Sequence, residues 1–430
     1  MTSLPMFGNV CRKCRMHGHG VMSSLRLRIM NNVNHETMGK VTPICASPVA
    51  IASSIKVIWG PVKYYSSYSG ATKMSAWQIH QYGRTEELSF VKATKAATIK
   101  SPNEILVKVH AASVNPIDVR MMDGYGRKLI NVLRAQKGFM KSGTEFPLIL
   151  GRDFSGTVIE TGRGVKKFQA GDEVWGALSP ERPGTHAEYA VVSQDEISLK
   201  PKNIMHTEAA SIPYVAATTW AALCTVGELR EHKAAGKRLL VLGGSGGIGT
   251  FAIQLAKSWG MHVTTTCSGD AIDLVTALGA DVAVDYKTGG PWRQLGQMSK
   301  FDLILDTIGG ESTSRAASLL GSWKNSKLVT IVSPILKNSD NLGVLPGLVK
   351  TALNAGVDTL MGLKSGGSVR WAVFMPNGSA MDRVRRMVES DQIKPIVQEV
   401  FPFLEVPAAF EKVSNGHLRG KIVINTTNSA

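Results

Sequence analysis

Cysteine is scarce in this chain, since its 430 residues contain only five. Cys11 and Cys14 form a C-x-x-C pair, but no second pair or strand–helix–strand pattern accompanies them, so the pair indicates neither a metal knuckle nor a redox motif. Only Cys224 and Cys267 lie beyond residue 70. Zinc sites built on several thiolates are therefore excluded, and so is a disulfide scaffold. So few cysteines suit a reducing compartment.

Acidic residues are also few, with 33 against 49 Lys and Arg, for a net charge of +16. Residues 1–70 are rich in serine and basic residues and contain a single acid, Glu36. This composition is typical of a mitochondrial transit peptide, and it predicts a mitochondrial protein, in the matrix. A basic disordered arm for nucleic acid is the alternative. The remaining chain has a mild positive charge and no nucleic-acid motif, so we expect no nucleic-acid partner.

Long uninterrupted apolar runs are absent. One apolar, glycine-rich stretch, residues 343–363, is broken by Pro346, Lys350 and Asp358. It predicts no transmembrane span. We expect it to form a helix pair that lines a lipophilic pocket or makes a dimer contact, although surface packing alone would also explain it.

A glycine cluster follows an apolar strand between residues 239 and 249. Gly244, Gly246 and Gly249 have the G-x-G-x-x-G spacing, and an apolar helical pattern and a β-branched strand, residues 262–266, come next. This is the strand–turn–helix–strand unit that places a pyrophosphate against backbone N–H groups. The residues expected to make this contact are Ser245, Gly246, Gly247 and Ile248.

The end of the second strand indicates which nucleotide binds. An NAD site usually carries an acid there, whereas this strand ends in Thr266, Cys267 and Ser268. A carboxylate would repel a 2′-phosphate, but the Ser268 hydroxyl can donate to it. We interpret Asp270 as the N-cap of the next helix. The sequence therefore predicts NADPH as the cofactor, with Tyr286 or Lys287 also near the phosphate.

Continuous apolar strands at 281–286, 301–306 and 327–333 predict a doubly wound parallel sheet of the Rossmann type. Loops after such strands line the cofactor crevice, so we expect Tyr286, Thr307 and Val332 there. Before this region, short β-like runs separated by turn residues predict a compact antiparallel domain. The strand at 420–425 is expected to return to that first domain.

Ordered motifs add a resemblance to this pattern. They are VNPID (residues 114–118), GRDFSG (151–156), FQAGDEVWG (168–176), GGSGGIG (243–249) and RGK (419–421). Together they resemble the zinc-free quinone-oxidoreductase branch of the medium-chain dehydrogenase/reductase superfamily, over residues 74–426. The resemblance implies an α/β fold with a GroES-like, β-rich catalytic domain at 74–204, a Rossmann domain at 205–368 and a C-terminal segment at 369–426. It also implies that Phe374, His417 and Arg419 contact the cofactor.

The resemblance also bears on zinc and on catalysis. Where alcohol dehydrogenases of the superfamily hold catalytic zinc with Cys, His and Cys, this chain has Asn115, Arg152 and Tyr214. Hydride transfer leaves negative charge on the acceptor, so the site needs hydrogen-bond donors. Asn115, Tyr125, Tyr214 and Arg152 are the candidates. Alternatively, Asn115 and Asp118 only fix the turn around Pro116, and Tyr125 is a partly buried side chain of the core without a catalytic role. The basic stretch at 127–146 is expected to lengthen the loop over this pocket.

The resulting hypothesis is a mitochondrial, NADPH-dependent, metal-free reductase of quinones or related conjugated carbonyls. The resemblance further implies a role in ubiquinone metabolism and a reticulon-family protein partner. We also expect the chain to form a homodimer. Two alternatives stay open: an enoyl thioester reductase in which Tyr125 donates the proton, and a nucleotide-binding interaction protein without catalysis. In each enzymatic case the substrate is small and lipophilic.

Overall fold

The structure is a computed structural model that describes residues 72–140, 143–322 and 325–427. The predicted transit peptide at 1–70 lies outside these residues, and so do Cys11 and Cys14. A six-stranded, fully parallel sheet has the order β11-β10-β9-β12-β13-β14. This order, 3-2-1-4-5-6 in strand sequence, is that of a dinucleotide-binding sheet, which confirms the predicted fold class. Its strands are β9 (Arg238–Leu242), β10 (His262–Cys267), β11 (Val282–Asp285), β12 (Leu303–Asp306), β13 (Lys327–Thr330) and β14 (Ser368–Trp371).

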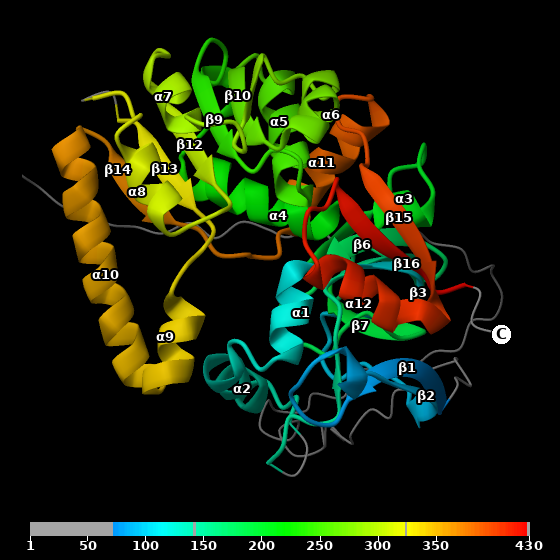
Figure 1. Cartoon of the computed structure of the whole chain (residues 1–430). Helices are drawn as coiled ribbons and strands as arrows, with labels where there is room; N and C mark the ends of the chain where they lie inside the picture. The colour runs from blue at the N-terminus through cyan, green and yellow to red at the C-terminus, as the bar shows by residue number, and fades with distance from the viewer. Residues whose placement is uncertain (1–71, 141–142, 323–324, 428–430) are drawn as a thin grey trace, which may run out of the picture. The chain divides into compact units, whose positions relative to one another are not determined.

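Helices cover both faces of this sheet, because alternate residues of each strand point to opposite sides. On one face Leu239 and Val241 pack with α4 (Pro213–Trp220), α5 (Gly247–Ser258) and α11 (Gly378–Glu389). On the other face Leu240 and Leu242 pack with α7 (Pro291–Gly296) and α8 (Glu311–Ala317). Figure 1 shows these helices around the sheet, together with α6 (Ile272–Ala277).

The sequence analysis did not predict the sixth strand, because the last parallel strand that it expected is at 327–333. β14 pairs in parallel with β13 from Ser368 to Trp371, so the sheet continues past the predicted domain boundary at 368. The reason it was missed is physical: a four-residue segment that contains Ser368 and Arg370 has no apolar run to mark it.

The remaining strands form two further sheets, which are antiparallel except where β15 and β16 pair in parallel. In the larger sheet the order is β15-β16-β3-β5-β6-β8, with β7 on β3, and in the smaller it is β2-β1-β4. The C-terminal strand β16 pairs with β3, as expected for residues 420–425. The elements of this part are β1 (Lys73–Ile79), β2 (Ser89–Lys95), β3 (Glu104–Val114), β4 (Leu148–Ile149), β5 (Asp153–Thr161), β6 (Glu173–Ala177), β7 (Tyr189–Ser193), β8 (Ile197–Leu199), β15 (Val397–Pro402), β16 (Lys421–Asn425), α1 (Pro116–Met122), α3 (His206–Ala209) and α12 (Val406–Ser414).

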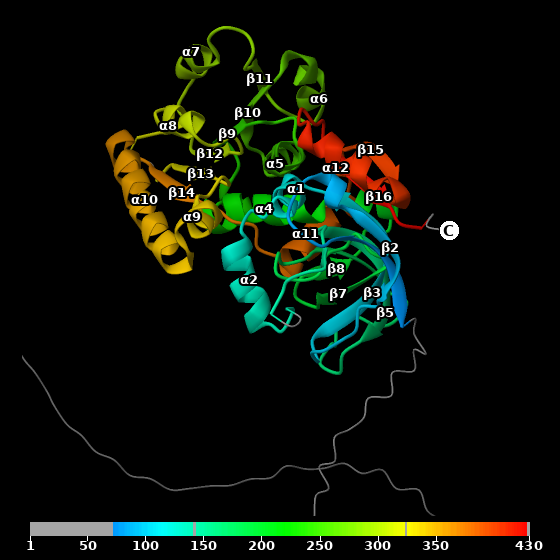
Figure 2. The same cartoon turned by 60° about the horizontal axis from the view of Figure 1, so that its bottom comes forward.

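Two stretches differ from their predicted form. Residues 127–136 are a helix, α2 (Arg127–Gln136), rather than part of a long loop. Residues 344–365 are one helix, α10 (Val344–Ser365), rather than a pair, because Pro346 lies in the first turn, where proline is tolerated. The partner of α10 is α9 (Ile335–Leu342), and the two lie side by side in both views (Figure 1, Figure 2).

One other stretch, His206–Val226, is long and apolar enough to cross a membrane by length and composition. It contains α3, α4 and a π-helical turn at Ala221–Val226. Because 78% of its most apolar window is buried inside the protein, it has the character of a core helix.

Candidate functional site

The three glycines of the G-x-G-x-x-G turn have different surroundings. A Cβ on Gly244 would lie 2.0 Å from Thr265 Oγ1, and one on Gly249 would lie 2.2 Å from the Gly243 carbonyl oxygen. Both positions therefore require glycine for close packing of helix and strands. A Cβ on Gly246 would meet only one atom, at 4.0 Å. Gly246 faces open space at the N-terminus of α5, which is the geometry that lets a pyrophosphate approach the backbone.

The predicted crevice residues lie at the carboxyl ends of the parallel strands. Thr307 follows β12, and its hydroxyl donates to the Leu242 carbonyl at 2.7 Å, which ties the loop to the end of β9. Tyr286 and Val332 follow β11 and β13 and are 47% and 40% exposed. Exposed large side chains at this edge give a nucleotide apolar and aromatic surface to cover.

Ser268 lies at the end of β10, where NADPH would place its 2′-phosphate. Its side chain is buried, and its hydroxyl accepts a hydrogen bond from Arg419 Nη2 at 2.9 Å. The same guanidinium nitrogen forms an ion pair with Asp270. Asp270 does not cap α6 as predicted, because it lies in a 3-10 turn at Gly269–Ala271 and its carboxylate turns to Arg419. The structure thus brings together two of the predicted cofactor residues, Ser268 and Arg419.

The segment 417–421 crosses the glycine turn and reaches both ends of the crevice. The Gly420 N–H donates to the Ser245 carbonyl at 3.0 Å, and Gly420 bridges Gly246. Arg419 projects to the phosphate end. Lys421 projects to the other end, and its stem lies against Gly247, where a Cβ would lie 2.7 Å from Lys421 Cδ. We call residues 417–421 the strap.

At the inner end, the Lys421 ammonium enters a buried polar cluster. Its Nζ donates to Ser113 Oγ at 2.7 Å, to Asn115 Oδ1 at 2.6 Å and to Asp153 Oδ2 at 3.1 Å. Asn115 Nδ2 in turn donates to Asp153 Oδ2 at 2.9 Å. The Tyr214 N–H donates to the other Asp153 oxygen at 2.5 Å. The cluster therefore fixes the orientation of the Asn115 amide, and the sequence analysis missed both Lys421 and Asp153 as its centre.

A second buried pair adjoins this cluster. Asp118 and Arg152 are 0% and 1% exposed, with Asp118 Oδ1 3.7 Å from Arg152 Nε. Burial raises the pKa of Asp118 to about 6, against the opposing influence of Arg152. Asp118 also accepts from the Asn115 N–H at 2.8 Å, which forms a capping box at the start of α1. This is the turn-fixing role that the sequence analysis kept as an alternative for Asn115 and Asp118.

Arg152, another candidate donor, is partly engaged by backbone carbonyl groups. Its Nη1 donates to the Ser179 carbonyl at 2.8 Å and to the Arg182 carbonyl at 3.2 Å. This buried guanidinium supports the backbone and pairs with Asp118, but its Nε and Nη2 have no hydrogen-bond partner among the described residues, so Arg152 stays a candidate donor.

The two candidate phenols remain. The Tyr214 ring stacks on Phe374, with ring centroids 4.3 Å apart and planes at 19°. Burial raises the pKa of Tyr214, and ionised Tyr125 would raise it further, so the two phenols lie within electrostatic range. Burial also raises the pKa of Tyr125, whose ring lies 5.8 Å from the Arg120 guanidinium. Both hydroxyls are protonated at neutral pH and can donate.

The donor set at this end is unfavourable for zinc. Asn115, Arg152 and Tyr214, which the resemblance aligns with the zinc ligands of alcohol dehydrogenases, supply an engaged amide, a permanent cation and a protonated phenol. Within residues 72–140, 143–322 and 325–427, no group of three or more His, Cys, Asp and Glu side chains could hold a metal ion.

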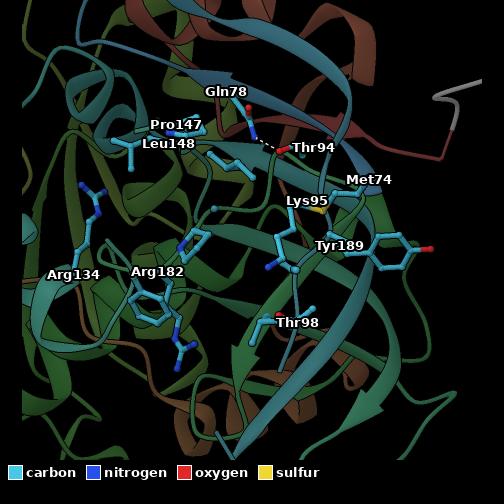
Figure 3. A pocket seen from close by; sticks show the side chains of 18 of the residues that line it. Met74, Gln78, Thr94, Lys95, Thr98, Arg134, Pro147, Leu148, Arg182 and Tyr189 are labelled. Carbon is cyan, nitrogen blue, oxygen red and sulfur yellow. Dashed lines mark hydrogen bonds between the residues drawn. The ribbon is translucent and has the colours of Figure 1, made fainter. Parts of the chain in front are cut away.

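A pocket elsewhere contains none of the predicted site residues. It is lined by residues of β1, β2, β4, α2 and β7, and Figure 3 shows Gln78, Lys95, Arg134, Arg182 and Tyr189 around it. Its Arg182 is held by Glu104 and Glu196, at 3.0 and 3.1 Å. This pocket therefore brings together none of the residues expected to bind the cofactor or to take part in catalysis.

Comparison with known proteins agrees with this geometry. Two family models match, one described as an alcohol dehydrogenase GroES-like domain over residues 101–202 and one as a zinc-binding dehydrogenase over residues 278–424. The chain is 50% identical over 361 residues to "NAD(P)H oxidoreductase RTN4IP1, mitochondrial" of Danio rerio, covering 84% of this chain and 93% of that protein. It is 36% identical over 363 residues to "Reticulon-4-interacting protein 1, mitochondrial" of Caenorhabditis elegans, covering 84% and 97%.

Among solved structures, the quinone oxidoreductase of Coxiella burnetii has a TM-score of 0.66 and 28% identity, covering 82% of this chain and 99% of that one.

Proposed function

This chain belongs to the medium-chain dehydrogenase/reductase superfamily, in the family of mitochondrial NAD(P)H oxidoreductases, and from that premise we propose that it reduces quinones or related conjugated carbonyls. It is an oxidoreductase that uses NADPH, and its relatives place it in the mitochondrion. The inner end of the crevice carries the proposal, because it presents two protonated phenols and no favourable metal-ligand set.

The residues of the crevice fit NADPH. Gly246 leaves room for a pyrophosphate at the start of α5, and Ser268 and Arg419 can donate to a 2′-phosphate. Bound in this orientation, NADPH supplies the hydride. Phe374 would hold Tyr214 beside the acceptor by stacking, and Tyr214 or Tyr125 would donate to the oxygen on which negative charge develops. Lys421 and Asp153 hold Asn115 and the Tyr214 backbone in place.

The direct test is turnover by the purified protein with NADPH and a panel of quinones and enoyl thioesters. We expect NADPH oxidation with quinones, at a rate unchanged by dialysis against a strong chelator. Loss of activity on chelation, restored by zinc, would overturn the metal-free mechanism. Tight NADPH binding without oxidation by any acceptor would favour the third hypothesis, an interaction protein without catalysis.

An enoyl thioester reductase is the second candidate. It is favoured by the place of Tyr125, a half-buried phenol that directly precedes the N-terminus of α2 and lies within range of Tyr214. Turnover of enoyl thioesters but not of quinones in the same panel would establish it.

Three finer proposals follow from the family. The first is a matrix location with a role in ubiquinone metabolism, for which loss of ubiquinone after depletion of the protein is the test. The second is a reticulon-family partner, which the name of the Caenorhabditis elegans relative supports and binding to purified reticulon would test. The third is a homodimer, which sedimentation of the full chain would test.

A further inference from the structure

Asp270 stands at the phosphate end without a role in the proposed function. It lies three residues beyond β10, and its carboxylate is ion-paired with Arg419 Nη2, the nitrogen that also donates to Ser268 Oγ at 2.9 Å. Its side chain is 66% exposed, whereas that of Arg419 is 25% exposed. The carboxylate therefore lies on the solvent side of the guanidinium, where an incoming phosphate would also arrive.

We infer that Asp270 is a specificity-determining residue that competes with the 2′-phosphate of NADPH for Arg419. The inference deepens the proposed function and rests on its assignment of Ser268 and Arg419 to that phosphate. Arg419 is the cation that the phosphate needs, and in the structure Asp270 holds it. NADPH must therefore displace one carboxylate, while NADH, which has a 2′-hydroxyl there, need not.

Two electrostatic effects set the size of this competition and keep it modest. The ion pair is partly exposed, so exchanging its carboxylate for a phosphate costs little. The carboxylate also stays close to the bound phosphate and repels its negative charge. Ser268 and Arg419 keep the Asp270 carboxylate ionised by lowering its pKa to about 2. The competition is therefore present across the physiological pH range.

Arg419 is also held by hydrogen bonds that do not involve Asp270. Its Nη1 donates to the carbonyls of His417 and Leu418, both at 3.3 Å, and its backbone N–H donates to Gln398 Oε1. These bonds hold the strap and place the guanidinium whether or not Asp270 is charged. Removing the Asp270 charge should therefore leave Arg419 in place and available to a phosphate.

The test is nucleotide binding to the full chain and to its Asp270→Asn variant, measured by calorimetry. The probes are NADPH and NADH, together with the fragments 2′,5′-ADP and 5′-AMP. We expect Asp270→Asn to bind NADPH and 2′,5′-ADP about three- to tenfold more tightly, with NADH and 5′-AMP unchanged. The matched control is Asp273→Asn, which removes the same charge from an exposed position one turn further on and should change none of these affinities.

Three outcomes would overturn the inference. One is an unchanged ratio of NADPH to NADH affinity in Asp270→Asn, and another is an equal gain in Asp273→Asn, which would indicate only net charge. The last is weaker binding of both cofactors, which would show that Asp270 accepts from the ribose hydroxyls. The proposed function fails separately, if the unmodified protein binds NADPH and does not oxidise it with any quinone.

Discussion

The two ends of the crevice hold their charges in different ways. At the inner end Asp118, Arg152, Asp153 and Lys421 have side chains that are at most 7% exposed, and every one of them has a charged or hydrogen-bonded partner within the cluster. At the phosphate end Arg419 and Asp270 form an ion pair open to solvent. One strap, residues 417–421, supplies a cation to each end.

Burial makes the same kind of ion pair serve different purposes. Breaking a buried pair leaves a desolvated charge behind, so the pair of Lys421 and Asp153 has a structural role: it fixes Asn115 and the Tyr214 backbone. A solvent-exposed ion pair contributes little to stability, so Arg419 can exchange Asp270 for a ligand. Mutations at the inner end should therefore change the free energy of unfolding, and mutations at the phosphate end should change the preference between NADPH and NADH.

The largest expected effect is the loss of the inner cation. Lys421→Met keeps the stem that packs on Gly247 and removes the ammonium, which leaves the Asp153 carboxylate buried without its cation. We expect a loss of about 3–5 kcal/mol in the free energy of unfolding, measured by denaturant titration. The double variant Lys421→Met, Asp153→Asn should recover part of it. If Lys421→Met lowered the free energy of unfolding by less than about 1 kcal/mol, the buried pair would be no more important for stability than an exposed one.

The next effect is the dependence of stability on pH at Asp118. Its folded pKa of about 6 lies above its ordinary value of 3.8, so the folded state holds a proton that the unfolded state releases. The resulting stabilisation is fully present below about pH 4 and is lost as pH rises through about 6. Its size is about 3 kcal/mol.

This contribution can be isolated by comparing the unmodified protein with Asp118→Asn. We expect the difference in free energy of unfolding between the unmodified protein and Asp118→Asn to change by about 3 kcal/mol between pH 4 and pH 7, as measured by denaturant unfolding. Parallel pH profiles for the two proteins would contradict the assignment of a raised pKa to Asp118.

A smaller effect is expected at the phosphate end from Ser268→Asp. The new carboxylate would lie beside Arg419 and repel the 2′-phosphate, so NADPH should bind about 10–100-fold more weakly, while NADH binding holds or improves. Ser268→Asn is the matched control, with similar size and no charge. Equal weakening by both variants would assign the effect to crowding, and equal affinities for NADPH and NADH in the unmodified protein would remove its basis.

Local patterns predicted much of the molecule. The glycine turn, the strands that flank it and the hydroxyl of Ser268 lie within about 30 residues of sequence, and the structure brings them together at the carboxyl end of the parallel sheet. β14 was not predicted, because a short segment with polar residues has little apolar periodicity. α10 was predicted as a pair of helices, because its glycine and proline residues weaken the helical pattern.

The charged clusters could not be predicted in this way. Lys421 contacts Asn115 across 306 positions of sequence, and Arg419 contacts Asp270 across 149. No local spacing links such residues, because the returning β16 brings them together only in the folded chain. The RGK motif at residues 419–421 indicated that the strap is important, but it did not predict which residues Arg419 and Lys421 contact.

The smallest expected effect concerns the proton at the inner end. Tyr125→Phe removes one hydroxyl and keeps the half-buried ring in place, so cofactor affinity should change little. If quinones accept the hydride by simple apposition with the nicotinamide, solvent can supply the proton afterwards, and NADPH oxidation should slow only a few-fold, on the order of 1 kcal/mol or less. Reduction of an enoyl thioester would need the proton at carbon, and the same variant should then lose about 10²–10⁴ in rate.

Initial rates with both acceptor classes, for the unmodified protein and the variant, distinguish these cases. Tyr214→Phe is the companion variant, because its phenol lies within range of Tyr125 and its ring is held by Phe374. A large loss with quinones in Tyr125→Phe alone would show that the inner end contains a true proton donor. Its buried charges would then serve to orient that phenol as well as to hold the fold.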